Sequence, residues 1–178
     1  MTSDPFESAI PPNSRAEALV AGADFFDAWS VETEMTDRPA LGYFISAAER
    51  TPRWVDACMN LRNRAGSLVG LKNLGSLSGI ASGKPAQAYR AGERVGIFTV
   101  FENAFDEALI GDKDKHLDVV LSVHRGPVQE NGRLVVTVST IVHVKNLLGR
   151  VYMLPVKPMH RLIAPAVLGA MTAASPAG

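Results

Sequence analysis

The last third of the chain contains two strand-like runs that lead directly into a long apolar tract with the character of a helix. The runs are Lys115 to His124 (KHLDVVLSVH) and Arg133 to Lys145 (RLVVTVSTIVHVK), and the tract is Asn146 to Met171. β-Branched residues are typical of strands, and the short polar connection between the runs favours an antiparallel hairpin. A chain that ends in a sheet and then a helix packs the two as layers, with room for a cavity between them. The sequence therefore predicts an α+β fold.

Length and composition indicate one ordinary globular domain. The chain has 178 residues, which is enough for one core and too few for two comfortable ones. Residues 1–12 contain three prolines and show no periodicity. This predicts a flexible N-terminal tail, followed by a single domain over residues 13–178.

Charge and hydropathy indicate which partners and which cellular compartment to expect. Lys plus Arg and Asp plus Glu both number 18, whereas a protein that grips phosphate backbones usually carries a basic excess. The longest apolar tract, residues 162–174, falls short of the roughly 20 residues that span a bilayer. The single cysteine excludes an internal disulfide, and the N-terminus lacks the basic and apolar regions of a secretion signal. We therefore expect a cytoplasmic protein that binds no nucleic acid and does not span a membrane.

Three further strands are predicted upstream of the terminal hairpin. Residues 23–32 are aromatic and β-branched, and residues 95–102 and 105–110 have the same character. The candidate inward positions of the first strand are Phe25, Trp29 and Val31. Because the later strands are joined by short polar connections, they should pair antiparallel with their neighbours.

Two helices are predicted between the first strand and the others. Asp37 precedes Arg38-Pro39 and opens a helix that runs to about Glu49, and Thr51-Pro52 repeats the same start signal. Apolar residues then recur at alternating spacings of four and three, which predicts one packed helix face. The residues of this face are Trp54, Cys58, Leu61, Ala65 and Leu68.

The terminal tract contains three prolines, which predict a kinked helix. Pro155, Pro158 and Pro165 each remove a backbone donor, at about 3 kcal/mol for an interior position. We expect one helix to end near Leu154 and another to start at Pro158.

Taken together, this order of elements resembles a known arrangement, and several short segments carry the resemblance. They are residues 22–25 (GADF), 51–55 (TPRWV), 92–98 (GERVGIF), 115–118 (KHLD), 143–149 (HVKNLLG) and 160–163 (HRLI). The order is similar to the helix-grip fold of the START-like (SRPBCC) superfamily, in which a curved antiparallel sheet packs on a long C-terminal helix. More closely, the chain resembles an uncharacterised bacterial family of that superfamily, classed as domain of unknown function 2867. The resemblance implies a cavity with a ligand, and, because relatives occur fused behind reductase domains, a reductase partner in trans.

The terminal hairpin suggests candidate acid–base residues. If its apolar residues share one face, His116 lies directly across from His143, with Asp118 two residues along on the same face. A carboxylate beside imidazoles supports acid–base chemistry, and we take these three residues as candidate catalytic groups. The alternative is a plain polar face, which is what the wet side of a sheet normally carries. A metal site is disfavoured because the residues do not form a closed ligand set, and we expect no cofactor.

Other residues are candidates for contact with a ligand. The C-terminal helix offers adaptable Met and Tyr side chains beside its predicted kink, although such residues are more often plain core. Asn146, between sheet and helix, either caps the helix or binds the ligand. The candidate ligand contacts are Trp54, Phe98, Ser122, Thr137, Ser139, Asn146, Tyr152, Met153 and Met159. His160 is expected at the surface or at a helix end.

Three functions remain open from the sequence. The first is the binding of a small hydrophobic or amphipathic molecule in a cavity between the sheet and the C-terminal helix. The second is an enzyme of the cyclase, dehydratase or hydrolase kind that uses His116, His143 and Asp118 in the same cavity. The third is an interaction domain, either a homodimer or a partner of a reductase, which uses the mixed face of the sheet as its contact.

Overall fold

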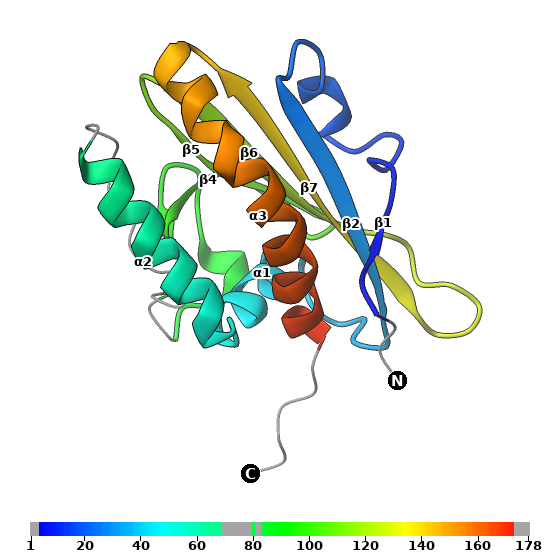
Figure 1. Ribbon diagram of the computed structural model, residues 1–178. Helices are drawn as coiled ribbons and strands as arrows, with labels where there is room; N and C mark the ends of the chain where they lie inside the picture. The colour runs from blue at the N-terminus through cyan, green and yellow to red at the C-terminus, as the bar shows by residue number, and fades with distance from the viewer. Residues whose placement is uncertain (1–3, 69–79, 81–82, 173–178) are drawn as a thin grey trace.

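The structure is a seven-stranded antiparallel sheet with helices on one face. The computed structural model describes residues 4–68, 80 and 83–172. The strands are β1 (Phe6–Glu7), β2 (Phe25–Thr33), β3 (Arg94–Val95), β4 (Phe98–Asn103), β5 (Glu107–Lys113), β6 (Leu117–Arg125) and β7 (Leu134–Val144). The helices are α1 (Ala40–Glu49), α2 (Arg53–Leu68) and α3 (Leu147–Thr172), with short 3₁₀ turns at Glu17–Leu19 and Ala86–Ala88. The strand order is β1-β2-β7-β6-β5-β4-β3, so the long hairpin β6–β7 forms the centre of the sheet (Figure 1).

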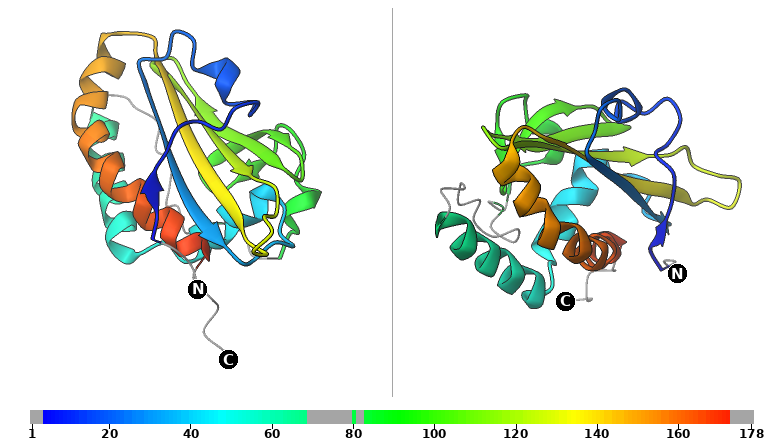
Figure 2. Two further views of the ribbon diagram at one scale, coloured as in Figure 1. Left: turned by 90° about the vertical axis from the view of Figure 1, so that its right-hand side faces the viewer. Right: turned by 45° about the horizontal axis from the view of Figure 1, so that its top comes forward.

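The two faces of the sheet have different covers. The face toward α1 and α3, here called the inner face, is apolar: Val31, Val123 and Val136 pack with Phe44 of α1 and Leu168 of α3. The N-terminal residues cross the opposite, outer face, and Figure 2 shows them on the other side of the sheet from the helices. The α+β fold with a long C-terminal helix on an antiparallel sheet is therefore confirmed.

The outer face carries both polar and apolar side chains, and many of the polar ones are buried. A chain of hydroxyl contacts runs from Ser8 Oγ to Ser30 Oγ and on to Thr137 Oγ1, with both distances at 2.7 Å. Glu107 is 2% exposed and accepts hydrogen bonds from the Ser122 hydroxyl (2.6 Å) and the Arg15 amide (2.8 Å). Such a face needs a polar cover, since buried polar groups without partners are destabilising.

The first residues of the chain are not a free tail where the structure describes them. Phe6 and Glu7 pair with Ser30 and Trp29, so β1 lies along the edge strand β2. An edge strand presents unpaired backbone donors and acceptors, and even two residues of β-structure satisfy part of that row. The predicted tail is therefore, from residue 4 onward, part of the outer cover.

The predicted apolar face of α2 is not packed. Trp54 and Leu61 of that face are exposed, whereas Val55 and Asn63 are buried and Met59 packs against the main core. Helical spacing identifies residues that share a side of a helix, but it does not say which side the rest of the fold covers. The prediction for Ala65 and Leu68 falls on side chains outside the described part of the chain.

The predicted break in the terminal helix is wrong. α3 continues through Pro155, Pro158 and Pro165, and its axis bends instead (Figure 2). Pro155 and Pro158 are exposed, and Pro165 is half-buried. The carbonyl groups that they leave without a donor belong to Val151, Leu154 and Arg161, which are exposed residues, so water can satisfy them.

Helix α1 begins slightly later than the sequence suggests. Pro39 has extended backbone angles and occupies the N-cap position, and no side chain caps the helix. One side of α1 is buried against the sheet, with Leu41 and Tyr43 fully covered. The Tyr43 hydroxyl donates to the Met35 carbonyl, and burial raises the pKa of this phenol.

Candidate functional site

A polar pair interrupts the apolar layer between the inner face and α3. His160 Nε2 of α3 lies 3.2 Å from Asp27 Oδ1 of β2. Because a carboxylate only accepts, Nε2 carries the proton and donates, which leaves Nδ1 as the basic nitrogen of a neutral ring. Trp29 Nε1 donates to the other oxygen, Asp27 Oδ2, over 3.3 Å. The Asp27 side chain is 9% exposed and that of His160 is 20% exposed.

The surroundings of this pair are apolar on both sides along the sheet. One cluster contains Leu117, Val142 and Met153, with Phe25 and Val156 packed against it. The larger core lies toward the other end and includes Leu168 of the last turns of α3. Thr140, directly across from Asp27 on β7, is also buried and adds a hydroxyl to the inner face. The Asp27–His160 pair is thus a polar site in the middle of the helix–sheet interface.

Local sequence explains how the two partners reach each other. Asp27 has the same strand parity as Phe25 and Trp29, so all three side chains point to the inner face. On α3, Met153, Val156 and His160 recur at spacings of three and four, which places them on one side of the helix. The ring of Phe25 stands edge-on to His160, with centroids 5.7 Å apart and planes at 88°. This contact fixes the orientation of the imidazole.

Sequence reasoning missed this pair, although a signal existed. His160 was expected at the surface or at a helix end, but it is half-buried against β2. A carboxylate at an inward strand position is unusual enough to indicate a partner, because a buried charge needs one. The partner itself is 133 residues away in the chain, so local patterning does not identify it.

The predicted acid–base residues lie elsewhere. Asp118, not His116, is directly across from His143, so the predicted hairpin register is wrong by two residues. Period-two alternation cannot detect a shift of two, because the shift again places apolar residues opposite apolar ones. The turn decides the register: Gln129 N donates to the Arg133 carbonyl, and Gly132 takes a left-handed conformation with φ of 75°.

Asp118 and His143 point to the outer face and do not bond each other. Asp118 Oδ1 forms an ion pair with Lys145 Nζ at 2.6 Å. His143 Nε2 lies 3.3 Å from the Ala21 carbonyl, to which it donates. Neither side chain therefore lines the space between the sheet and α3.

His116 contacts the start of α3 through Asn146. Asn146 Oδ1 accepts from the Gly149 amide at 3.1 Å, so Asn146 caps α3, which is one of its two predicted roles. Its amide nitrogen then faces His116 Nδ1 at 3.0 Å and donates to it. The buried Nε2 atom of His116 has no hydrogen-bond partner within the described part of the chain.

Asp114 holds the turn that carries His116. Its Oδ1 accepts from the amides of His116 (2.6 Å) and Leu117 (2.9 Å). Burial raises the pKa of Asp114, but these amides, together with the nearby His116 and Lys145, outweigh burial and hold the pKa below its ordinary value.

Asp114→Asn is therefore expected to lower the free energy of unfolding by about 1 kcal/mol near neutral pH. The pKa of Asp114 is lower in the folded protein than in the unfolded chain. The carboxylate therefore stabilises the fold at pH values above its pKa in the unfolded chain. This stabilisation is lost as the pH falls through its pKa in the folded protein. The difference between wild type and variant should thus shrink as pH falls below the ordinary carboxyl range and disappear once Asp114 is protonated in the folded protein. Urea unfolding at several pH values measures it, with Glu130→Gln as an exposed control. A difference that persists in acid would contradict the assignment.

The remaining residues that were predicted to contact a ligand lie in several parts of the fold. Ser122, Thr137 and Ser139 are buried on the outer face, beneath the N-terminal cover. Phe98 is core, with its ring 5.7 Å from that of Phe44. Met153 is buried beside the half-buried Tyr152 in the apolar cluster next to the Asp27–His160 pair. Trp54 and Met159 are exposed on α2 and α3.

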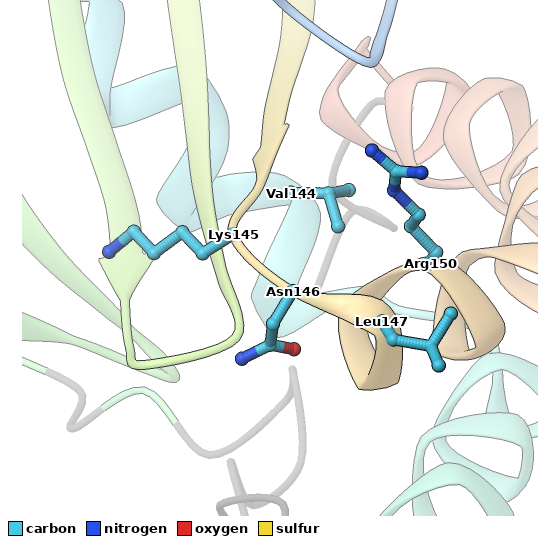
Figure 3. A pocket seen from close by; sticks show the side chains of 5 residues that line it. All are labelled: Val144, Lys145, Asn146, Leu147 and Arg150. Carbon is cyan, nitrogen blue, oxygen red and sulfur yellow. The ribbon is translucent and has the colours of Figure 1, made fainter.

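Two small pockets occur outside the helix–sheet interface. One of about 150 Å³ lies where β7 meets α3 and is lined by Val144, Lys145, Asn146, Leu147 and Arg150. Figure 3 shows that the three polar side chains there point in different directions, so they do not converge on one ligand atom. The other, of about 340 Å³, lies on the outer face and is lined by Pro11, Pro12, His124, Gly126, Pro127, Gln129, Val135 and Thr137.

Within the described ranges, no cluster of three or more His, Cys, Asp or Glu residues is suited to a metal ion. Over the same residues, none of the helices combines the length and apolar character needed to cross a membrane.

Comparison with known proteins identifies the family. Neither the curated proteins nor the solved structures provide a match. The family described as "Protein of unknown function (DUF2867)" matches residues 19–167, from just before β2 to within the last turns of α3. That range contains both partners of the Asp27–His160 pair and the whole hairpin β6–β7. The chain therefore belongs to this family, the proteins of unknown function DUF2867.

Proposed function

We propose that this protein binds a small apolar or amphipathic molecule between the inner face of the sheet and α3. The observation that carries the proposal is the Asp27–His160 pair, a partly exposed polar group set between two apolar clusters. Ligand sites commonly combine apolar walls with a few placed polar groups. The sheet-and-helix architecture also supports placing the protein among helix-grip proteins of the START-like superfamily.

The chemistry of the pair indicates the kind of ligand. The Asp27 carboxylate accepts from His160 through one oxygen and from Trp29 through the other, which uses two of its roughly four acceptor sites. A ligand hydroxyl or amine can therefore donate to Asp27 without displacing either protein partner. The apolar body of such a ligand would contact Phe25, Val142 and Met153. This describes an amphipathic molecule with one polar end.

The bend in α3 gives this interface a way to adapt. Pro155 and Pro158 lie within the two turns that precede and include His160, and each removes a backbone hydrogen bond of the helix. A helix deforms most easily where its hydrogen bonds are missing. Separation of this part of α3 from β2 would enlarge the space around the pair without unfolding the rest of the helix.

Native mass spectrometry of protein purified without extraction tests the proposal. Asp27→Asn and His160→Leu should lose a small molecule that co-purifies with the wild type, whereas His143→Leu on the outer face should retain it. His116→Ala in the same series tests the predicted role of that residue. Retention of the molecule by both inner-face variants would rule out the pair as its anchor.

A second function is favoured by the same geometry. A carboxylate that orients an imidazole and leaves its second nitrogen basic is the usual arrangement of a general base. On this reading the protein is an acid–base enzyme in which Asp27 and His160 act on the bound molecule. Asp27→Asn distinguishes the two functions. If the protein only binds the molecule, the variant should lose affinity for it. If the protein is an enzyme, the variant should still bind the substrate but no longer convert it.

A further inference from the structure

The side of α3 that faces away from the sheet is apolar over four turns. Leu147, Val151, Leu154 and Leu162 are 75%, 54%, 72% and 67% exposed, and Pro158 lies in line with them. Their spacings of four, three, four and four residues place them on one side of the helix, here called the outer stripe. Single exposed leucines are normal, but a contiguous apolar stripe indicates an interaction surface.

A row of basic residues runs along one edge of this stripe. Arg150, Lys157 and Arg161 are separated by seven and four residues, so they lie on the same side of α3. Arg150 and Arg161 are exposed, and Lys157 is half-buried with Nζ 3.5 Å from the Asp24 carbonyl. Residues 147–172 contain no Asp or Glu. The surface of α3 is therefore both apolar and purely basic.

This charge distribution distinguishes between possible partners. In a symmetric contact with a second copy, the same patch meets itself, so the basic rows would be brought toward each other without any acidic residue of α3 to offset them. An anionic lipid surface matches both features. The apolar side of a helix that lies in the interface plane is buried at the level of the acyl chains, and its basic residues meet the headgroups.

The neighbouring helix α2 also carries exposed apolar and basic residues. Trp54 and Leu61 of α2 are exposed, and Arg53 and Arg64 on the same helix are exposed as well. Figures 1 and 2 show α2 beside α3, on the same side of the sheet. Tryptophan is enriched at the level of lipid headgroups, where its ring contacts apolar matter and its N–H contacts water.

We propose that the outer stripe and the basic row of α3 bind the surface of an anionic membrane. The helix lies along the surface and does not enter as a span, in agreement with its mixed apolar and basic character. The proposal is independent of the Asp27–His160 pair, which lies on the opposite side of α3. A failure of one proposal therefore leaves the other intact.

Vesicle sedimentation with the full chain tests this proposal. The probes are vesicles of phosphatidylcholine alone and of phosphatidylcholine mixed with phosphatidylserine. Binding should occur to the mixed vesicles, should weaken with added salt, and should be much weaker to phosphatidylcholine alone. Arg150→Gln/Arg161→Gln should weaken binding to mixed vesicles about 30-fold, which corresponds to about 1 kcal/mol for each basic residue near the surface.

Apolar variants and a matched control complete the design. Leu154→Glu/Leu162→Glu should reduce binding by about tenfold or more, because both side chains are removed from the acyl boundary. Val128→Glu changes an exposed apolar residue in the β6–β7 loop, at 51% exposure, and should leave binding unchanged. All of these positions are exposed, so circular dichroism should show the same fold for each variant.

Two results would overturn the proposal. One is the absence of binding to the mixed vesicles, or binding that both α3 variants leave unchanged. The other is a dimer in native mass spectrometry that Leu154→Glu/Leu162→Glu dissociates, which would assign the outer stripe to a second copy of the chain.

Discussion

Glu107→Gln is expected to lower the free energy of unfolding by about 3 kcal/mol. The wild-type carboxylate is 2% exposed and accepts from Ser122 at one oxygen and from the Arg15 amide at the other. The Arg15 guanidinium adds an ion pair at 3.3 Å to the second oxygen. Glutamine keeps the volume but replaces one acceptor with a donor. The glutamine NH2 group can donate to the Ser122 hydroxyl, but the hydroxyl proton then loses its buried acceptor, and the Arg15 guanidinium loses the negative charge of its partner.

The same arginine supplies the control for this experiment. Arg15 Nε also lies 3.0 Å from Glu102 Oε2, but the Glu102 side chain is 54% exposed. Glu102→Gln should therefore change the free energy of unfolding by less than about 1 kcal/mol, as is usual for exposed ion pairs. Urea unfolding of both variants at one pH measures the contrast. Equal, small effects would show that Glu107 does not hold the N-terminal segment on the outer face.

Gly149→Ala is expected to destabilise the protein by about 2 kcal/mol, although alanine is the better helix former. A Cβ atom at position 149 would lie 2.5 Å from the His116 carbonyl oxygen and 2.9 Å from Val144 Cγ1. The first contact is with backbone, which cannot move aside as a flexible side chain can. The first turn of α3 would have to shift away from the turn before β6, and this shift would strain the Asn146 cap and its contact with His116.

A second glycine of the same helix tests the reason for this effect. At Gly169 the nearest atom to an added Cβ would be Pro5 Cγ at 3.5 Å, an ordinary contact. Gly169→Ala should therefore leave the free energy of unfolding unchanged or raise it by up to about 1 kcal/mol. Thermal or urea unfolding of the two variants distinguishes the steric effect at position 149 from the gain in helix propensity that alanine brings at both positions. A stabilising effect at both positions would contradict the tight contact between α3 and the turn before β6.

Local patterns predicted most of the elements correctly. The strand predicted at 23–32 is β2, at Phe25–Thr33, and the run predicted at 133–145 is β7, at Leu134–Val144. Alternation of apolar residues also identified which residues of β6 and β7 share a face. These results depend on side-chain periods of two and 3.6, which are properties of the backbone within one element.

The wrong predictions share a different origin. A register shift of two residues keeps every side chain on its face, so alternation did not distinguish Asp118 from His116 as the neighbour of His143. The helical stripe of Trp54 and Leu61 was correct as a stripe but is exposed, because the rest of the fold covers the other side of α2. Pro158 does not end α3, because the carbonyl that it leaves without a donor belongs to the exposed residue Leu154.

Patterns within the sequence thus indicated most of the elements, their order, the antiparallel pairing of neighbouring strands and the faces on which their side chains lie. These follow from interactions between residues that are close in the chain. Which faces are covered and which distant residues meet depends on how the elements pack together. Asp27 and His160 come together because β2 lies beside β7 at one edge of the sheet and α3 returns across the inner face. Such contacts depend on how whole layers of the fold pack together. Because the burial of apolar surface is non-directional, the sequence around one residue does not indicate which distant residue it will contact.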